Sequence, residues 1–336
     1  MTLQQRKKAF KSLGEYLLSD DERLHQLINS AHFYNGWFTQ SETLRAVKAW
    51  GRSLNENDLN VWLGDIEGEG SGKTIGLVLA GNVPMVGFHD IITVLASGNI
   101  AMIKLSSQDK MLIPHILTKL IEFEPLFSSK IKLVERLEAF DAVIATGSNN
   151  TSRYFEYYFG KVPNIIRKNR NSVAVLDGQE SENDLQKLGK DIFNYFGLGC
   201  RNVSKLFVPE GYNFEKFFKA IESFKPVIDN HKYSNNYDYN KSIFLVNRNK
   251  HLDNGFLLLK QDAGLASPLA VVFYEEYDSL AELSKSLNSM TQNIQVIVSN
   301  TDLDVDNPVV NFGESQEPRL WDYADGVNTL EFLRKL

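Results

Sequence analysis

The first 65 residues carry apolar side chains at the spacing of one helix face. Examples are Phe10, Leu13 and Leu17, followed by Leu24 and Ile28. Apolar residues that recur every three to four positions indicate amphipathic helices. We therefore predict a helical N-terminal region, which ends at the stretch 64–72, rich in glycine and glutamate.

From Thr74 onwards, compact apolar runs alternate with segments of helical periodicity. These runs predict strands, and the segments between them predict helices. Uninterrupted apolar strands that alternate with helices indicate a parallel sheet that is covered on both faces. The predicted strands are 74–80, 100–104, 142–146 and 172–176, and the predicted helices are 84–96, 110–123 and a segment that ends near Tyr158.

The pattern then repeats over the second half of the chain. A helical segment covers 185–196, and later apolar runs predict strands over 205–209, 242–246, 269–274 and 294–299. We read this as a second α/β domain. The predicted boundaries are 1–178 for the helical region with the first sheet, 179–310 for the second domain, and 311–336 for a tail that ends in a short helix.

Composition narrows the class of protein. The chain has 336 residues, a net charge of -6 and no long basic block, which argues against a nucleic-acid partner. Its single cysteine permits no intramolecular disulfide, as suits a reducing cytoplasm. The N-terminus has no apolar segment typical of a secretory signal, and the apolar stretch 75–88 is too short and interrupted to span a membrane. We expect a cytoplasmic protein; whether it forms a homo-oligomer is left open.

Cys200 is the candidate nucleophile. Gly197 and Gly199 precede it, and a predicted strand follows within a few residues. Glycines permit positive backbone dihedrals and close approach of a substrate. A thiolate attacks acyl groups well and leaves well, so this position suits acyl transfer, although a lone cysteine is more often a small buried apolar residue.

Two turns that follow strands carry further candidates. Asn82 lies before Pro84, where it is either the cap of the next helix or a side-chain amide that stabilises an oxyanion. Thr146, Gly147 and Ser148 follow the third strand and open a helix, where backbone N–H groups suit a pyrophosphate.

These sites, in this order, resemble the aldehyde dehydrogenase superfamily. Asn82-x-Pro84 is similar to its oxyanion motif, and 97–104 resembles its strand that ends in a cofactor-binding lysine, here Lys104. The triplet 146–148 resembles its T-G-S turn, and Gly197-x-x-Cys200 resembles its nucleophile motif, with Lys205 at a usual arginine position. The resemblance covers about 73–330 and implies an aldehyde-dehydrogenase-like fold, with a nicotinamide cofactor in the first domain and the nucleophile in the second.

Within the superfamily the chain looks most similar to the LuxC-type acyl-CoA reductases. This similarity rests on three segments: Gly81-Asn-Val-Pro84, the run Phe312-Gly-Glu-Ser-Gln-Glu-Pro318 and the ending 322–332. The resemblance implies an acyl-CoA substrate, acyl transfer to Cys200, and reduction by NADPH to an aldehyde. The chain is short for that family, mainly before the first predicted strand.

Two departures from the superfamily bear on the chemistry. Oxidising members carry a glutamate that activates water, but here Ile166 stands at that position and no Asp or Glu occurs between Tyr157 and Leu176. Without a positioned base, water is poorly activated, so an acyl-enzyme should persist until CoA or hydride arrives. The glutamate that holds the nicotinamide ribose is also absent, with Gly264 near its position.

The residues after Lys104 favour NADPH over NADH. Relatives that prefer NAD often place a glutamate there, whereas this chain has Ser106 and Ser107, and the 2′-phosphate would meet a lysine and hydroxyls. Asp109 weakens this inference if the loop folds back, so NADH stays the alternative cofactor.

Other polar residues have weaker claims to a role. We interpret His89, Asp90 and His115 as structural, and we see no metal-ligand spacing. The basic run Lys161, Arg167, Lys168 and Arg170 is either a solvated surface or a contact for a phosphate of CoA or of the cofactor.

The expected activity is therefore NADPH-dependent reduction of an acyl-CoA through an acyl-Cys200 thioester. Asn82 and the backbone N–H of Cys200 would stabilise the oxyanion, and Lys104, Ser106, Ser107, Thr146, Gly147 and Ser148 would bind the cofactor. Two alternatives remain: a reductase of an acyl phosphate in the same superfamily, and a non-catalytic binding protein that retains the fold.

Overall fold

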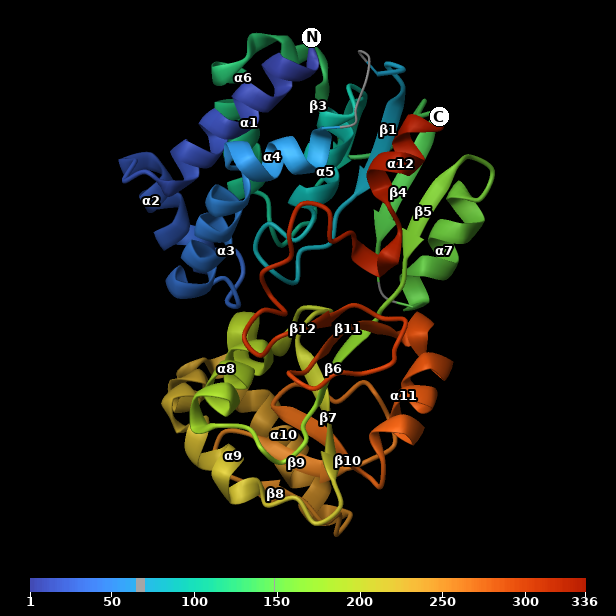
Figure 1. The fold of residues 1–336 in the computed structure, drawn as a ribbon. Helices are drawn as coiled ribbons and strands as arrows, with labels where there is room; N and C mark the ends of the chain where they lie inside the picture. The colour runs from blue at the N-terminus through green and yellow to red at the C-terminus, as the bar shows by residue number, and fades with distance from the viewer. Residues whose placement is uncertain (65–69, 148) are drawn as a thin grey trace. The chain divides into compact units, whose positions relative to one another are not determined.

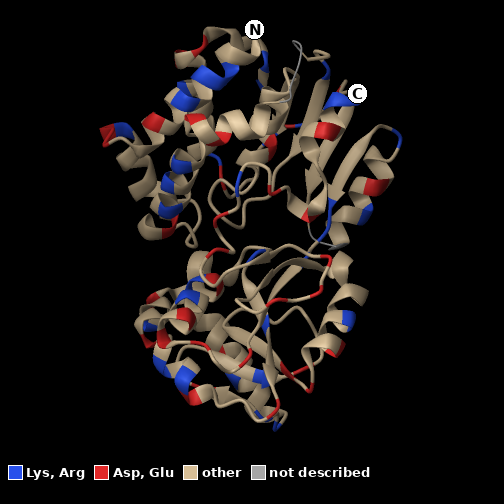
Figure 2. Ribbon diagram, viewed as in Figure 1, with Lys and Arg blue, Asp and Glu red and all other residues tan. Residues whose placement is uncertain are grey.

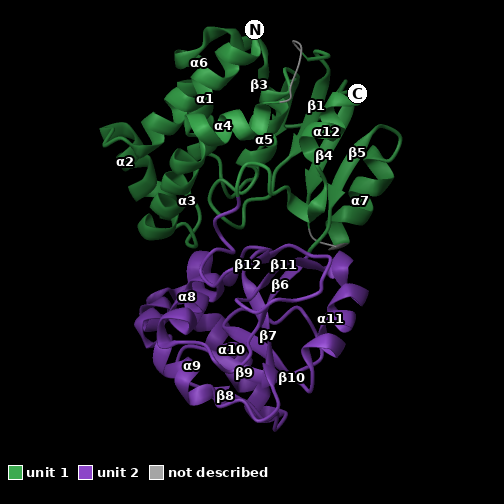
Figure 3. Ribbon diagram, viewed as in Figure 1, with its two compact units in different colours: residues 1–169, 319–336 green, residues 170–318 purple. Residues whose placement is uncertain are grey.

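The computed structural model describes residues 1–64, 70–147 and 149–336, which form two compact units (Figures 1 and 3). Unit 1 comprises Met1–Asn169 and Arg319–Leu336, and unit 2 comprises Arg170–Pro318. The sequence placed the boundaries at 178/179 and 310/311. The difference arises because the strand after Arg170 pairs within the second sheet, and because the last residues return to unit 1.

Unit 1 begins with helices whose starts are set by capping side chains. Thr2 and Gln5 form a reciprocal capping box, Asp21 accepts from the Leu24 N–H at 2.8 Å, and Asn55 accepts from the Asp58 N–H at 2.9 Å. Such caps satisfy N–H groups that a helix leaves unpaired. The helices are α1 (Leu3–Leu18), α2 (Glu22–Ser30), α3 (Gln40–Ser53) and α4 (Glu56–Leu63).

The sheet of unit 1 has five parallel strands in the order β3-β2-β1-β4-β5. Its strands are β1 (Thr74–Val78), β2 (Ile100–Lys104), β3 (Ile131–Leu133), β4 (Ala142–Thr146) and β5 (Asn164–Arg167), and its helices are α5 (Phe88–Ala96), α6 (Leu112–Phe123) and α7 (Asn149–Phe159). The chain moves outward from β1 first through β2 and then through β4. Ligands of open α/β sheets bind at the carboxyl ends of the strands where the order reverses in this way.

The C-terminal segment completes unit 1. Its helix α12 (Thr329–Arg334) contacts α5. The buried Arg167 pairs with the buried Asp90 and donates to Thr329 Oγ1 at 3.1 Å. His89 Nε2 donates to the Leu320 carbonyl at 2.8 Å. His89 and, through Arg167, Asp90 therefore hold the tail, which agrees with their interpretation as structural residues.

Unit 2 is a seven-stranded sheet in the order β12-β11-β6-β7-β10-β9-β8. β8 runs antiparallel to β9, and the other described pairs are parallel. The strands are β6 (Asn171–Val175), β7 (Val203–Pro209), β8 (Leu252–Asp253), β9 (Leu258–Gln261), β10 (Val271–Tyr277), β11 (Ile294–Val298) and β12 (Val309–Val310). The helices are α8 (Glu182–Phe193), α9 (Phe214–Ala220), α10 (His231–Val246) and α11 (Leu280–Ser289). The predicted α/β class with parallel sheets and a helical N-terminal region is confirmed.

Two predicted elements are wrong. The expected strand 242–246 is the last part of α10, which starts under the cap of Asn230; only Phe244 of its apolar end is buried, while Val246 is 82% exposed. The helix expected to start at Pro84 starts at Phe88, because Met85 has a φ of 59° and no helix continues through a left-handed residue.

Charged residues of both signs are mixed along the elements of each unit. Figure 2 shows lysine and arginine interspersed with aspartate and glutamate along the helices. Among the described residues, no helix is both long and apolar enough to cross a membrane. Within the same residues, no group of histidine, cysteine, aspartate and glutamate side chains could hold a metal ion.

Candidate functional site

The predicted cofactor residues of unit 1 gather at one edge of its sheet. The registers place Val78 of β1 beside Lys104 of β2 and Ala145 of β4, with all three strands parallel. The segments after these strands therefore emerge at the same edge. They carry Asn82 after β1, Lys104, Ser106 and Ser107 at the end of β2, and Thr146 and Gly147 at the end of β4.

Lys104 offers a positive charge to that edge. Its side chain is exposed, and no hydrogen bond or ion pair holds the ammonium within the described ranges. The neighbouring backbone is close, since a Cβ built on Gly81 would lie 2.2 Å from Ser106 Oγ. Only a glycine allows this approach of the β1 loop to the serine.

Asp109 is buried, whereas Lys104 and Ser107 are exposed. The carboxylate of Asp109 accepts from the Met85 N–H at 3.0 Å. Burial raises the pKa of Asp109 to about 6. The carboxylate thus supports the turn after β1.

Asn82 lies in the turn that leads from β1 to α5. The cap of α5 is Gly87, five residues further on, and it makes no side-chain capping bond. The capping alternative for Asn82 is therefore wrong. The turn is supported instead by Asp109 at Met85 and by Asn35, whose amide donates to the Gly81 carbonyl at 3.4 Å.

The turn after β4 is described only in part. Thr146 pairs with Arg167 of β5, and the Gly147 N–H donates to the Arg167 carbonyl at 3.5 Å. Ser148 lies outside the described residues. The helix that follows, α7, starts at Asn149, so Gly147 stands between a strand end and a helix, as predicted.

Cys200 occupies a sharp turn of unit 2 and is exposed. The turn connects α8, through a short 3₁₀ segment (Asn194–Gly197), to β7. Tyr195, Phe196 and Gly197 have φ values of 54°, 58° and 76°. Gly197 adopts this left-handed conformation freely, but the two aromatic residues are strained by it. The predicted bend is present, and it depends on more than its glycines.

Two buried residues fasten this turn. Ser172 Oγ on β6 donates to the Cys200 carbonyl at 2.9 Å. The Asn202 side chain, 4% exposed, accepts from the Gly199 N–H at 2.8 Å and donates to the carbonyls of Asp191 and Asn194, both at 2.9 Å. Sequence reasoning missed both residues. The available signal was a polar amide beside the candidate nucleophile, just before a strand.

Two cations that the sequence singled out are structural. Lys205 is 1% exposed, and its ammonium donates to the Ala263 carbonyl at 2.9 Å and pairs with Glu275. Arg167 is buried in its pair with Asp90, so the solvated-surface alternative is wrong for that residue.

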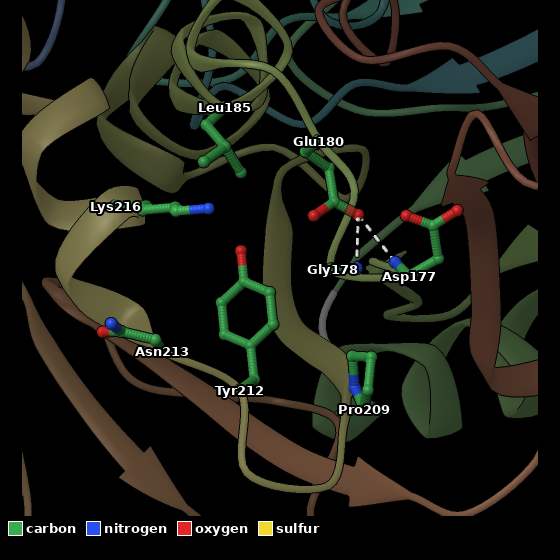
Figure 4. Close-up of a pocket in the computed structure, with 8 residues that line it drawn as sticks. All are labelled: Asp177, Gly178, Glu180, Leu185, Pro209, Tyr212, Asn213 and Lys216. Carbon is green, nitrogen blue, oxygen red and sulfur yellow. Dashed lines mark hydrogen bonds between the residues drawn. The ribbon is translucent and has the colours of Figure 1, made fainter.

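A pocket of ≈ 190 Å³ in unit 2 lies away from Cys200. It follows the carboxyl end of β7, whereas Cys200 precedes the amino end, and the seven residues of β7 span about 20 Å. The Tyr212 hydroxyl points into it between Lys216 and Glu180 (Figure 4). Its walls are Asp177, Gly178, Glu180, Leu185, Pro209, Tyr212, Asn213 and Lys216.

A family model links these residues to known proteins. Residues 66–223 match the model described as "Acyl-CoA reductase (LuxC)". This range includes every predicted site residue, from Asn82 to Cys200. No curated protein matches the sequence significantly.

Solved structures agree on the fold at low sequence identity. Aldehyde dehydrogenase 21 from Physcomitrella patens, in complex with succinate, has a TM-score of 0.71 at 14% identity, with 99% of this chain and 85% of that chain covered. An indole-3-acetaldehyde dehydrogenase complexed with NAD⁺ has a TM-score of 0.69 at 12% identity, with 98% and 80% covered. The glyceraldehyde-3-phosphate dehydrogenase GapN from Methanocaldococcus jannaschii, complexed with NADP, has a TM-score of 0.66 at 12% identity, with 100% and 88% covered. The predicted resemblance is confirmed: the chain has the fold of the aldehyde dehydrogenases and carries a segment that matches the LuxC acyl-CoA reductases.

Proposed function

We propose that this protein reduces an acyl-CoA to an aldehyde through an acyl-Cys200 thioester, with NADPH as the reductant. The LuxC match and the fold support an oxidoreductase that acts on an acyl or aldehyde group. The observation that carries the finer proposal is the exposed thiol of Cys200 on a turn fastened by buried hydrogen bonds, inside the matched segment.

Cys200 forms and later breaks the covalent bond. Its thiolate attacks the thioester carbonyl, the C–S bond to CoA breaks, and CoA leaves as a thiol after protonation. The acyl group is then held on Cys200 Sγ. After reduction, the thiohemiacetal on Cys200 collapses, the carbon–sulfur bond breaks, and the aldehyde leaves with the thiolate restored.

Asn82 is proposed to donate its side-chain amide to the oxygen that becomes negative during attack. The turn that holds it is supported by the buried Asp109 and by Asn35. A donor fixed in advance needs little reorganisation at the moment of reaction, which is how such groups lower a barrier. The backbone N–H of Cys200 is proposed as the second donor.

The carboxyl edge of unit 1 fits a nicotinamide dinucleotide. Lys104 is exposed there, and Ser106 and Ser107 follow it. Gly81 brings the backbone close to Ser106, and Asp109 accepts a hydrogen bond within the turn after β1. We propose that Lys104, Ser106 and Ser107 contact the adenosine ribose phosphate, and that the 146–148 turn contacts the pyrophosphate. NADPH, when bound, supplies one hydride to the acyl carbon.

The decisive experiment is intact-mass spectrometry after mixing with a panel of acyl-CoAs in the absence of cofactor. We expect a stable mass increase of one acyl group in the wild type and none in Cys200→Ala. Thermal unfolding of the variant serves as the folding control, because an exposed thiol contributes little to the core. An adduct that persists in folded Cys200→Ala would exclude this nucleophile.

The two alternatives are separated by different measurements. An acyl phosphate reductase would form the same adduct from an acyl phosphate but not from an acyl-CoA. A binding protein that only retains the fold would form neither adduct, and a titration with NADPH, NADH and CoA would then report which ligand it binds.

A further inference from the structure

The segment 312–318 of unit 2 has a structural task that the proposed chemistry leaves unexplained. The N–H groups of Gly313 and Ser315 donate to the two carboxylate oxygens of Asp191, at 2.6 Å and 3.0 Å. Asp191 is fully buried near the end of α8, and Ser315 is fully buried beside it. Gly313 has a φ of 88°, and a Cβ there would lie 3.2 Å from Lys187 Cβ, so glycine is what lets the segment approach the helix.

The backbone carbonyl of Asp191 connects this segment to the turn that carries Cys200. This carbonyl accepts from Asn202 Nδ2 at 2.9 Å, while Asn202 Oδ1 accepts from the N–H of Gly199, the residue before Cys200. One buried amide thus joins the end of α8 to the nucleophile turn. An asparagine suits this position because a single side chain both accepts and donates hydrogen bonds.

We propose that Asn202 is the positioning residue of Cys200, and that the segment Phe312–Ser315 reinforces it through Asp191. Tyr195 and Phe196 keep a left-handed backbone only where surrounding contacts outweigh the strain. Asn202 supplies such contacts before and after them, at the Asn194 carbonyl and at the Gly199 N–H. Without Asn202, the turn relaxes and the thiol leaves its reactive position. The expected effect on catalysis rests on the proposed function, whereas the expected effect on the conformation of the turn does not.

The geometric part is tested without any substrate. Cys200 is the single cysteine of the chain, so a thiol reagent such as iodoacetamide reports on it alone. In Asn202→Ala we expect hydrogen exchange over 194–202 to accelerate at least about tenfold, because the variant loses the bonds to the Gly199 N–H and to the Asp191 and Asn194 carbonyls. We also expect the pH profile of Cys200 alkylation to shift.

Asn307→Ala is the matched control. Asn307 is 6% exposed in the same unit, and its amide donates to the carbonyls of Thr291 and Ile294, at 3.1 Å and 2.9 Å. It borders β11, which is separated from β7 by β6. We expect this variant to lose comparable stability while exchange over 194–202 and Cys200 alkylation keep their wild-type values. Asn202→Asp would place a buried carboxylate against the carbonyls of Asp191 and Asn194, so we expect it to disturb exchange and alkylation at least as strongly as Asn202→Ala.

The catalytic part is read as a split between kcat and KM. We expect Asn202→Ala to lower the rate of Cys200 acylation about a hundredfold at saturating acyl-CoA, with little change in KM, as for a misplaced reacting group. Asp191→Asn should act in the same direction and less strongly, because its amide can still accept one of the two N–H groups.

The outcomes separate this inference from the proposed function. If the wild type forms no acyl adduct but Asn202→Ala changes exchange and alkylation, the function is wrong and the positioning role stands. A folded Asn202→Ala protein with wild-type exchange, alkylation and acylation would overturn the positioning role, whatever the substrate proves to be.

Discussion

The two turns that carry the candidate catalytic residues are supported in similar ways but by different chemistry. The turn of Asn82 in unit 1 contains left-handed Met85 and is held by the buried carboxylate of Asp109. The turn of Cys200 in unit 2 contains left-handed Tyr195 and Phe196 and is held by the neutral amide of Asn202. A carboxylate responds to pH and an amide does not. The group that contacts the strained turn directly is therefore titratable in the first turn and neutral in the second, where the titratable Asp191 lies one step further away and reaches Asn202 through its backbone carbonyl.

The largest expected effect concerns water as a competitor at Cys200. The carboxylate near this turn, Asp191, has both oxygens occupied by backbone N–H groups, so it is poorly placed to activate water. With aldehyde and oxidised cofactor alone, we expect turnover to slow sharply after about one equivalent of reduced cofactor. Added CoA should restore turnover, because a thiol attacks an acyl-enzyme without strong activation. Cofactor absorbance against time measures both phases, and rapid repeated turnover without CoA would reveal an overlooked base.

The second prediction tests whether the Asn82 turn takes part in chemistry. Asn82→Ala should slow acylation about a hundredfold, the usual effect of losing an oxyanion donor, with little loss of stability. Asn55→Ala is the comparison, because Asn55 caps α4 and accepts from the Asp58 N–H. That variant should lose about 1 kcal/mol of unfolding free energy and keep its rate. Single-turnover rates and thermal midpoints measured on the same samples decide the question.

A third, smaller effect is expected at the cofactor edge beside the first turn. Lys104→Ala should raise the Kd of NADPH about tenfold and leave that of NADH nearly unchanged, because the ammonium is proposed to contact the 2′-phosphate. Lys132→Ala, an exposed lysine on neighbouring β3, is the control. Equal weakening of both cofactors would place Lys104 elsewhere on the dinucleotide.

The last prediction concerns the pH response of the first turn, and it is an effect on stability with no direct effect on the chemistry. Burial raises the pKa of Asp109 in the folded state from its ordinary value of 3.8 to about 6. Between these two pH values the folded state therefore keeps a proton that the unfolded chain releases. The stability contributed by this group is thus fully present below about pH 4 and is lost as the pH rises through about 6. Relative to Asp109→Asn, the unfolding free energy of the wild type should fall by about 2 kcal/mol between about pH 4 and pH 7. Denaturant unfolding of both proteins measures it, and parallel curves would contradict the shifted pKa.

The elements that follow local rules were predictable from the sequence. The strands that became β1, β2 and β4 are compact apolar runs, and their carboxyl ends carry the cofactor candidates at one edge, as expected for a parallel sheet. Cys200 was recognised because glycines and a strand flank it. The cytoplasmic location, the oligomeric state and the roles of the site residues stay predictions.

The elements that the sequence misplaced have two different causes, one local and one that depends on residues distant in the sequence. The apolar end of α10 resembled a strand because its helical character lies in the polar residues before it. The strand predicted over 172–176 is present as β6, but its membership of the second sheet follows from pairing with β7 and β11. Asn202 and Asp191 were missed because their importance comes from the backbone groups that they reach.

The return of the C-terminus to unit 1 has a consequence for biosynthesis. Unit 2 is one continuous stretch, 170–318, and all of its strands are available once that stretch has left the ribosome. Unit 1 is not continuous, because the partners of Arg167 and His89, which are Thr329 and Leu320, are translated only after the whole of unit 2. The half that is synthesised first is therefore the half that is completed last. A nascent chain whose residues 170–318 have emerged while residue 319 and those after it are still inside the ribosome would display a finished second unit and an unfinished first one, which makes the nascent first unit the natural client of a chaperone.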